Sequence, residues 1–299
     1  MSRYPGWRDN VFPAGAPSVS VERGIVAETV RAERLGFDPT VPNDARIFDY
    51  YMGGKDNFAA DRKAARHMLD VAPELPLMCR EGRRLLSRVV RYLIGAGVRQ
   101  FIDLGCGLPT MGNVHEVAQA AAPGSRVVYV DNDPVVVRHS QALLEQNDDT
   151  VVIEADLRDT RAVLGHPRVE ALIDPDLPVA VLLHFTLILV PDDDEAARVV
   201  AEYRDAVAPG SYVAIAHSVC DPKPEASAKL AAIYRDTGVV DGPRRGQVRS
   251  KAEVESFFDG LRVVDPGIVY IPWWRPDPGE SLPGPETVWS VGGVGRVER

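Results

Sequence analysis

Residues 101–113 read FIDLGCGLPTMGN, and this stretch decides the fold. Its apolar beginning, from Phe101 to Leu104, predicts a buried strand, and a helical pattern begins at Asn113. Gly105 and Gly107 can adopt positive φ angles and let the backbone come close to a ligand. The helix that follows adds a partial positive charge at its N-terminus. A buried strand that turns sharply into a helix in this way predicts a site for a nucleotide-like cofactor.

The spacing of the glycines distinguishes between two kinds of cofactor. A dinucleotide site has the pattern G-x-G-x-x-G, but Thr110 stands here where the third glycine would be. Asp103 precedes the first glycine, and its carboxylate would repel a pyrophosphate but attract an ammonium group. The order acid, any residue, Gly, any residue, Gly is the S-adenosylmethionine pattern, with Asp103 facing the methionine end. The turn therefore favours S-adenosyl-L-methionine over a nicotinamide dinucleotide.

Composition limits the class of protein. The chain has 299 residues, of which 45% are hydrophobic, so it can bury one large α/β core. Its net charge of −9 disfavours non-specific binding to nucleic acid or to an acidic membrane. Three scattered cysteines without a C-x-x-C pair favour neither a disulfide framework nor a structural zinc site. We expect a cytoplasmic protein without a metal site that binds a small molecule, and the oligomeric state stays open.

The chain divides into three parts. Residues 1–41 are an N-terminal arm and a leading helix over Val21 to Leu35. Residues 42–97 form a helical cap. Pro42 followed by Asn43 and Asp44 marks the start of one helix, and Gly53-Gly54 ends it. Asp56-Asn57 begins another helix. Pro73 and Pro76 interrupt the chain before an amphipathic helix through Leu85 and Leu93. Residues 98–299 form the cofactor-binding domain.

Strands and helices alternate after residue 98, which is typical of a parallel, doubly wound sheet. The second strand ends at Asp131-Asn132, and Asp133 and Pro134 begin the next helix. An acid at this point holds ribose hydroxyls in such folds, so Asp131 is a candidate ribose ligand. The other strands are expected over Val151–Ile153, Val179–Leu187, Tyr212–Ala216, Leu261–Ile271 and Glu286–Val291, with a helix over Pro191–Val207 and a capping box at Ser250 and Glu253.

Three long stretches carry a family resemblance. They are PNDARIFDYYMGGKDNFAADR (42–62), RQFIDLGCGLPTMGNVHEVAQ (99–119) and SRVVYVDNDPVVVRHSQALL (125–144). Shorter echoes are VPDDDEAARVV, PGSYVAIAHS and GGVGR. The chain resembles the actinobacterial S-adenosylmethionine-dependent methyltransferases once grouped as a domain of unknown function. The resemblance implies a Rossmann-like class I methyltransferase with a seven-stranded, mostly parallel sheet, helices on both faces and an N-terminal helical cap.

The resemblance also implies roles for individual residues. Asp103, Gly105 and Gly107 would cradle the methionine part of the cofactor. The ribose would lie at Asp131 and Asn132, and the adenine at Asp156 and Leu157.

Two departures from the family pattern concern the acceptor side. The family usually has Glu-Asn-Arg where this chain has Glu81-Gly82-Arg83. The family usually has a histidine shortly before the Pro-Asp-Asp-Asp run, and this chain has Ile188 at that position. Catalytic residues are therefore not transferred from the family. A non-catalytic S-adenosylmethionine-binding or regulatory protein of the same fold is the alternative function.

The expected reaction is methyl transfer from a sulfonium to an oxygen or nitrogen of a small molecule, for which positioning does most of the work. His217 ends the fifth strand at the carboxyl edge of the sheet and is the first candidate for a general base. His184, flanked by apolar residues, is expected to be a core histidine. Tyr50, Tyr51 and Asn57 surround the double glycine Gly53-Gly54. Two interpretations stay open: these residues form a lid that contacts the ligand, or they form a packed helix junction. The absence of N/D-P-P-Y argues against methylation of nucleic-acid bases.

Overall fold

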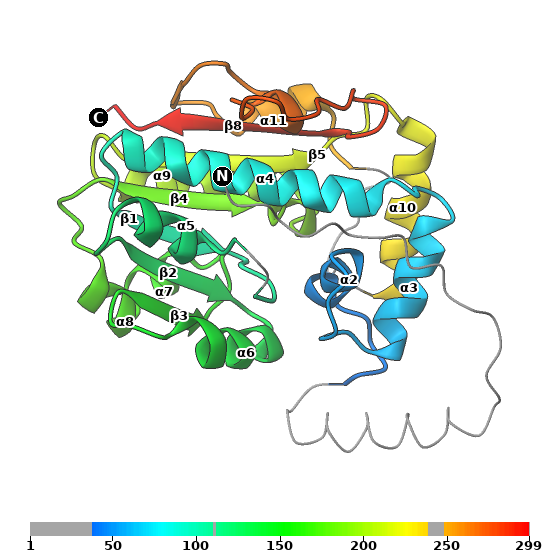
Figure 1. Cartoon of the computed structure of the whole chain (residues 1–299), viewed down its shortest axis with the longest axis horizontal. Coiled ribbons are helices and arrows are strands. Elements are labelled where there is room, and N and C mark those ends of the chain that lie inside the picture. Colours follow the sequence, from blue (N-terminus) through cyan, green and yellow to red (C-terminus); the bar gives the residue numbers. More distant parts are fainter. Residues whose placement is uncertain (1–37, 110–111, 239–247, 299) are drawn as a thin grey trace.

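The computed structural model describes residues 38–109, 112–238 and 248–298. The arm and the helix expected over Val21 to Leu35 lie outside the described residues. Within them the strands form one sheet in the order β3-β2-β1-β4-β5-β8-β6, and β7 also pairs with β8 (Figure 1). The strands are β1 (Gln100–Leu104), β2 (Arg126–Asp131), β3 (Thr150–Glu154), β4 (Val179–His184), β5 (Tyr212–Ser218), β6 (Arg262–Val263), β7 (Val269–Tyr270) and β8 (Ser290–Arg296).

The sheet is mostly parallel, as the sequence predicts. β1 lies at its centre between β2 and β4, and in both pairs the register is parallel, with Asp103 opposite Tyr129 and Leu182. β3 and β5 extend the parallel part on either side. β8 runs antiparallel to β5, and the short strands β6 and β7 pair with β8. The Rossmann-like fold class expected from the sequence is confirmed.

Helices cover both faces of this sheet. They are α2 (Asp44–Tyr51), α3 (Ala59–Leu69), α4 (Leu75–Gly95), α5 (Val114–Ala121), α6 (Pro134–Leu144), α7 (Thr160–Leu164), α8 (Pro167–Leu172), α9 (Asp193–Ala206), α10 (Pro224–Thr237) and α11 (Lys251–Ser256), with the 3-10 helices η1 (Leu187–Leu189) and η2 (Ile271–Trp273). Alternate residues of a strand point to opposite faces. Phe101 packs in the core beneath α4, α5 and α6, whereas Ile102 packs in the core beneath α7, α8, α9 and α11.

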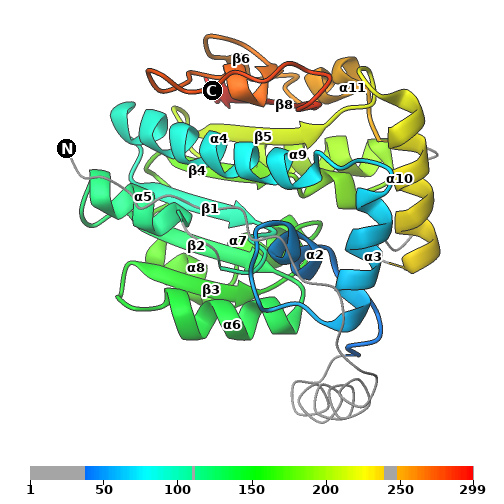
Figure 2. The ribbon, with the colours of Figure 1, turned by 45° about the vertical axis from the view of Figure 1, so that its right-hand side comes forward.

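The helices that cover the ligand-binding edge of the sheet are not the same as those in the segment 42–97, which was expected from the sequence to form the cap. α2 and α3 lie beyond the carboxyl ends of the parallel strands, and α10 from the later part of the chain lies beside them (Figures 1 and 2). α4 instead runs along one face of the sheet, because its apolar stripe, which includes Leu85, Val89 and Leu93, is buried there. The helices that approach the ligand-binding edge of the sheet are thus α2, α3 and α10.

Several element boundaries differ from the sequence-based expectations. α3 begins at Ala59, because the backbone amide of Phe58 donates to Asp61 Oδ2 and makes Phe58 the N-cap. The side-chain amide of Asn57 instead donates to Asp49 Oδ2. α4 begins at Leu75, and Pro76 lies in its first turn, where a missing N–H costs nothing. The fourth strand ends at His184, since Phe185 has a φ of 64° and turns the chain away.

The last strand is β8 rather than the expected Glu286–Val291. Gly292, Gly293 and Gly295 lie inside this strand, where the absence of a side chain permits close packing. A Cβ on Gly292 would come within 2.8 Å of Leu85 Cδ2, and one on Gly295 within 2.7 Å of Leu261 Cβ.

Candidate cofactor site and an adjoining cavity

A cavity of about 250 Å³ lies at the carboxyl edge of the sheet. We call it the cofactor cavity. Six segments meet there: the turns after β1, β2, β3 and β4, one side of α2, and α4. The seven residues that the sequence assigns to the cofactor all line this one cavity: Asp103, Gly105, Gly107, Asp131, Asn132, Asp156 and Leu157.

Asp103 supplies a buried carboxyl group to this cavity. The residue is only 4% exposed, and no described group donates a hydrogen bond to its side chain. Burial raises the pKa of Asp103 to about 7, while the positive charge of Arg83 opposes the rise and the negative charge of Asp131 adds to it. A buried carboxyl group without a donor would be stabilised by a cationic ligand group. It therefore fits the ammonium of a methionine moiety.

The glycine turn after β1 is packed too tightly for side chains. Gly105 and Gly107 have φ angles of 71° and 65°. A Cβ on Gly105 would lie 2.1 Å from Thr186 Cγ2. The amide of Gly105 donates to the carbonyl of Val130, and the amide of Gly107 donates to Asp131 Oδ2. The turn is thus fixed to the end of β2, and these two amides are used inside the protein rather than pointing at a ligand.

Asp131 is held in place by the same turn. Its Oδ2 accepts from the Gly107 amide at 3.0 Å, and its Oδ1 accepts from the Asp133 amide at 3.0 Å. Burial raises the pKa of Asp131 to about 6, although these backbone hydrogen bonds lower it. Each oxygen keeps a further lone pair, so the carboxylate can still accept from two neighbouring hydroxyl groups. This arrangement fits a ribose.

Asp156 and Leu157, which the resemblance assigns to the adenine, both line the cofactor cavity. The Arg158 side chain donates to both oxygens of Asp156, and these hydrogen bonds lower the pKa of Asp156. Asp156 is therefore an anchored carboxylate, and Leu157 provides an apolar wall beside Gly105. The two together offer a polar edge and a flat apolar contact to a base.

Arg83 is a cavity residue that sequence reasoning missed. It extends from α4, its guanidinium lies 5.4 Å from the centre of the Phe48 ring, and its Nε is buried without a hydrogen-bond partner among the described residues. Burial lowers the pKa of Arg83, and the nearby Asp103 partly offsets this. A signal was present, since Arg83 is three positions before Leu86 on the buried stripe of an amphipathic helix.

His184 also lines the cofactor cavity, although the sequence indicates a core histidine. Its ring lies 4.8 Å from the Phe185 ring, and its Nε2 is buried without a hydrogen-bond partner within the described ranges. Burial, followed by the charge of Arg83, lowers the pKa of His184 to about 3, so the ring is neutral at pH 7. A Cβ on Gly82 would lie 2.7 Å from Phe185 Cε2, so the glycine at this position makes room for both rings.

α2 closes one side of the cofactor cavity, but not with the residues expected from the sequence. Asp44, Ala45 and Phe48 line it, at helical spacing on one face. Tyr50, Tyr51 and Asn57 are not among the lining residues. The hydroxyl of Tyr51 donates to the Ala65 carbonyl, the amide of Asn57 donates to Asp49, and Tyr50 packs against the core. These three residues form the packed helix junction rather than a ligand contact.

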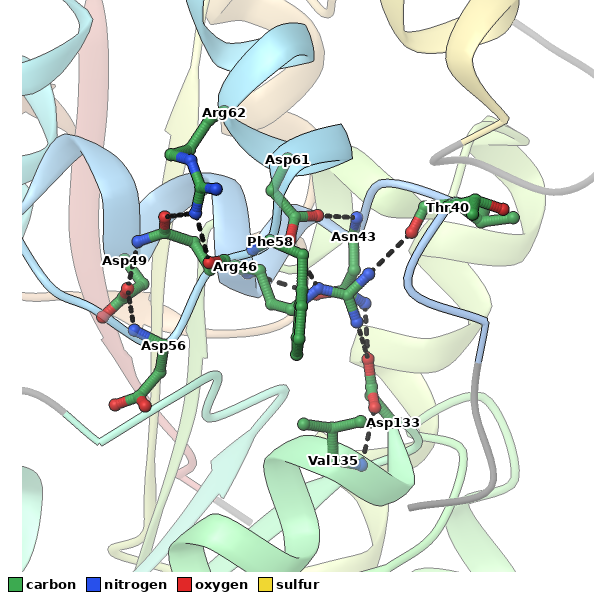
Figure 3. Close-up of polar contacts among 12 residues, drawn as sticks. Thr40, Asn43, Arg46, Asp49, Asp56, Phe58, Asp61, Arg62, Asp133 and Val135 are labelled. Carbon is green, nitrogen blue, oxygen red and sulfur yellow. Dashed lines mark hydrogen bonds and ion pairs between the residues drawn. The ribbon is translucent and has the colours of Figure 1, made fainter. Parts of the chain in front are cut away.

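A polar cluster fastens the cap to the sheet domain beside Asp131 (Figure 3). Asn43, the N-cap of α2, donates through Nδ2 to Asp133 Oδ2 at 2.7 Å, and its backbone amide donates to Asp61 at 2.9 Å. Arg46 donates to Asp61 at 2.9 Å and approaches Asp133 Oδ2 to 3.8 Å. Arg46 and Asp61 are 2% and 0% exposed, so their charges are paired away from water. The cap is therefore attached next to Asp131, whose Oδ1 accepts from the amide of Asp133.

The structure does not bring His217 to the cofactor cavity. His217 is fully buried and lines a separate cavity of about 120 Å³, which we call the second cavity. Its Nε2 lies 3.2 Å from a guanidinium nitrogen of Arg249, and its Nδ1 contacts the Ser218 carbonyl. Because arginine only donates, Nε2 accepts and Nδ1 carries the proton. Both ring nitrogens are engaged, so the ring serves to hold Arg249 and the η1 segment.

The fold and the cavity together define a class I methyltransferase: a parallel sheet with one antiparallel strand, an acidic glycine turn after β1 and an acid at the end of β2. The chain belongs to the S-adenosyl methyltransferase family, whose model matches residues 31–298. It is therefore an S-adenosyl-L-methionine-dependent methyltransferase.

Two solved structures from actinobacteria are similar to the chain. A candidate methyltransferase from Thermobifida fusca is 41% identical, with a TM-score of 0.81, over 89% of this chain and 97% of that chain. A DUF574 family protein from Streptomyces avermitilis is 38% identical, with a TM-score of 0.79, over 86% of this chain and 97% of that chain. None of the curated proteins matches the chain.

Within the described residues, no group of three or more His, Cys, Asp or Glu side chains is arranged to hold a metal ion. No helix in the same part of the chain is both long and apolar enough to cross a membrane.

Proposed function

We propose that this methyltransferase acts on an oxygen or nitrogen of a small molecule. The observation that carries the proposal is the enclosure of the acceptor side: α2 closes the cofactor cavity, and the space next to it is a cavity of about 120 Å³. A cavity of this volume suits a group of a few atoms rather than a macromolecular surface. The net charge of −9 also disfavours a nucleic-acid acceptor.

The residues of the cofactor cavity suit the parts of S-adenosyl-L-methionine. Asp103 would hold the ammonium and Arg83 the carboxylate of the methionine part. Asp131 and Asn132 would hold the ribose, and Asp156 and Leu157 the adenine. When bound, the cofactor supplies a methyl group activated by its sulfonium charge. Together, these contacts would leave the side formed by α2 and the turn after β4 for the acceptor.

We propose that residues 98–299 act as the cofactor-binding domain and that α2 acts as a lid. A lid that excludes water would strengthen the electrostatic contacts inside the cavity. His217 as a general base does not enter this proposal, because its ring nitrogens are already engaged. His184 lines the cofactor cavity with a neutral ring and could accept a hydrogen bond from a ligand.

The alternative function is a non-catalytic S-adenosylmethionine-binding protein. The departure at Ile188, where the family has a histidine, favours it, because Ile188 lines the second cavity and offers no polar group there.

Two measurements test the proposed function. Calorimetry should find binding of S-adenosyl-L-methionine and S-adenosyl-L-homocysteine, and no binding of NAD. Incubation with S-adenosyl-L-methionine and a panel of small hydroxyl and amino compounds should then release S-adenosyl-L-homocysteine. Tight cofactor binding without turnover across the panel would favour the non-catalytic alternative, and binding of NAD alone would contradict the cofactor assignment.

A further inference from the structure

The second cavity has apolar walls from three separate elements. Leu75 and Met78 come from α4, Ile188 and Leu189 from η1, and Leu230 from α10. An engineered apolar cavity of about 150 Å³ binds benzene. The second cavity measures about 120 Å³ and therefore suits one six-membered ring or a short alkyl chain.

The second cavity adjoins the cofactor cavity. Leu189 lines both. Tyr234, which lines the second cavity, donates its hydroxyl at 2.8 Å to Oδ1 of Asp44, which lines the cofactor cavity. An Asp–Tyr pair thus stands where the two spaces meet.

The Asp44 carboxyl group has an accepting position to spare. Among the described residues only Tyr234 donates to its side chain, so Oδ2 is left without a donor. Burial raises the pKa of Asp44, although the hydrogen bond from Tyr234 lowers it. Burial also raises the pKa of Tyr234 well above its usual value, so the phenol keeps its proton and stays a donor.

We propose that the second cavity binds the methyl acceptor, and that this acceptor is a hydroxyl group carried on one apolar ring or a short alkyl chain. The hydroxyl would lie against Asp44, with the apolar part among Leu75, Leu189 and Leu230. This proposal rests on the proposed function and narrows its acceptor class.

Protonation favours a hydroxyl acceptor over an amine. Arg235 and Arg249 line the second cavity, and the Arg249 guanidinium is paired with Asp193 Oδ1 at 2.9 Å, so its charge is compensated. A protonated amine has no lone pair with which to attack a methyl group, whereas a neutral hydroxyl keeps its lone pairs. A hydroxyl can also donate to Asp44 while its oxygen faces the cofactor cavity.

The proposed step is balanced. The acceptor oxygen forms the new bond to the methyl carbon, and the electron pair of the broken carbon–sulfur bond stays on sulfur, which becomes neutral. The acceptor proton passes to the Asp44 carboxylate. Tyr234 acts through Asp44 and is a positioning residue, since it fixes the orientation of that carboxylate.

The first test measures binding of a probe, 4-ethylphenol, to the full-length protein saturated with S-adenosyl-L-homocysteine. Ala231 lines the second cavity and Ala232, its neighbour on α10, does not. Calorimetry should find binding to the wild-type protein, at least tenfold weaker binding to Ala231→Phe, and unchanged binding to Ala232→Phe. No binding to the wild-type protein, or equal binding to both variants, would overturn the assignment of the second cavity.

The second test separates the role of Asp44 from cofactor binding. Asp44→Asn should keep the affinity for S-adenosyl-L-homocysteine within about twofold, but lower kcat for methylation of 4-ethylphenol by about 100-fold or more. Tyr234→Phe should lower kcat less than Asp44→Asn does, and it should raise the KM for 4-ethylphenol only slightly. Unchanged kcat in Asp44→Asn, or a wild-type protein that binds 4-ethylphenol without methylating it, would overturn the proton-accepting role. Either outcome would leave the proposed function standing if other acceptors are methylated.

Discussion

Cofactor affinity should depend strongly on pH between 5.5 and 7.5, because two buried carboxyl groups face the cofactor cavity. In the free protein burial raises the pKa of Asp103 to about 7 and that of Asp131 to about 6. Each carboxyl is mostly protonated below its pKa. An ammonium group and ribose hydroxyls bind better to the ionised forms. Binding should therefore weaken as the pH falls.

The size of the effect follows from the two pKa values. Between pH 7.5 and 5.5 the ionised fraction of a group with a pKa of about 7 falls ~25-fold, and that of a group with a pKa of about 6 falls ~4-fold. If both must be ionised, the affinity for S-adenosyl-L-homocysteine should fall ~100-fold, or about 2.7 kcal/mol. About 1.4 protons should be released on binding at pH 6, ~0.9 from Asp103 and ~0.5 from Asp131.

Calorimetry with S-adenosyl-L-homocysteine at several pH values, in buffers of different ionisation enthalpy, measures both the affinity and the protons released. 5′-Methylthioadenosine, which lacks the amino acid part, should show only the ~4-fold component that comes from Asp131. Asp103→Asn should reduce the dependence for S-adenosyl-L-homocysteine to the same ~4-fold. An affinity that is constant over this range would refute an ionic contact between Asp103 and the ligand.

Three further predictions concern single side chains. Asp131→Ala should weaken binding of S-adenosyl-L-homocysteine by about 1.5 to 3 kcal/mol in calorimetry, and an unchanged affinity would remove the ribose assignment. Arg83→Met should weaken the binding of S-adenosyl-L-homocysteine by about 2 kcal/mol but leave the binding of 5′-methylthioadenosine unchanged, because only the former ligand carries a carboxylate. Equal losses of affinity for both ligands would indicate a structural role instead. Asn43→Ala should lower the free energy of unfolding in urea by about 1 kcal/mol, since Asp133 loses a donor. As a control, substitution of the exposed Thr40 by Ala should change this free energy by less than about 0.5 kcal/mol. Equal effects of the two substitutions would contradict the attachment of the cap through Asn43.

The sequence predicted the sheet domain well because its signals are local. An apolar run that ends in Asp103 and two glycines specifies a strand and a turn, whatever surrounds it. Asp131 and Asp156 follow strands of the same parallel sheet, so their positions at one edge follow from the topology. The N-caps at Asn43 and Asp133 also follow from local hydrogen-bonding chemistry.

The acceptor side was not predictable to the same extent because it is built from distant segments. Asp44 and Tyr234 are 190 positions apart and meet only when α10 packs beside the cap. The period of α2 allows several faces to be the buried one. The sequence indicates Tyr50 and Tyr51 because they flank the double glycine, whereas Asp44 and Phe48 line the cofactor cavity. His217 does stand at the end of a strand, but the sequence cannot indicate that Arg249 occupies its ring nitrogen.

The glycines of β8 also show why local signals fail near tight packing. Glycine weakens a strand in isolation, and the strand expected over Glu286–Val291 stops just before Gly292. In the fold, the space at Gly292 and Gly293 is filled by Leu85 and Ile268 from other elements. The preference of the segment is overridden by contacts that only the tertiary structure creates.

A crystal structure of the full-length protein with S-adenosyl-L-homocysteine tests the central claim most directly. The account predicts the ribose at Asp131, the methionine ammonium at Asp103, and the sulfur on the side of the cofactor cavity formed by Asp44 and Leu189, next to the second cavity. A ligand whose sulfur lies away from Asp44 and Leu189, or whose ribose does not contact Asp131, would contradict it.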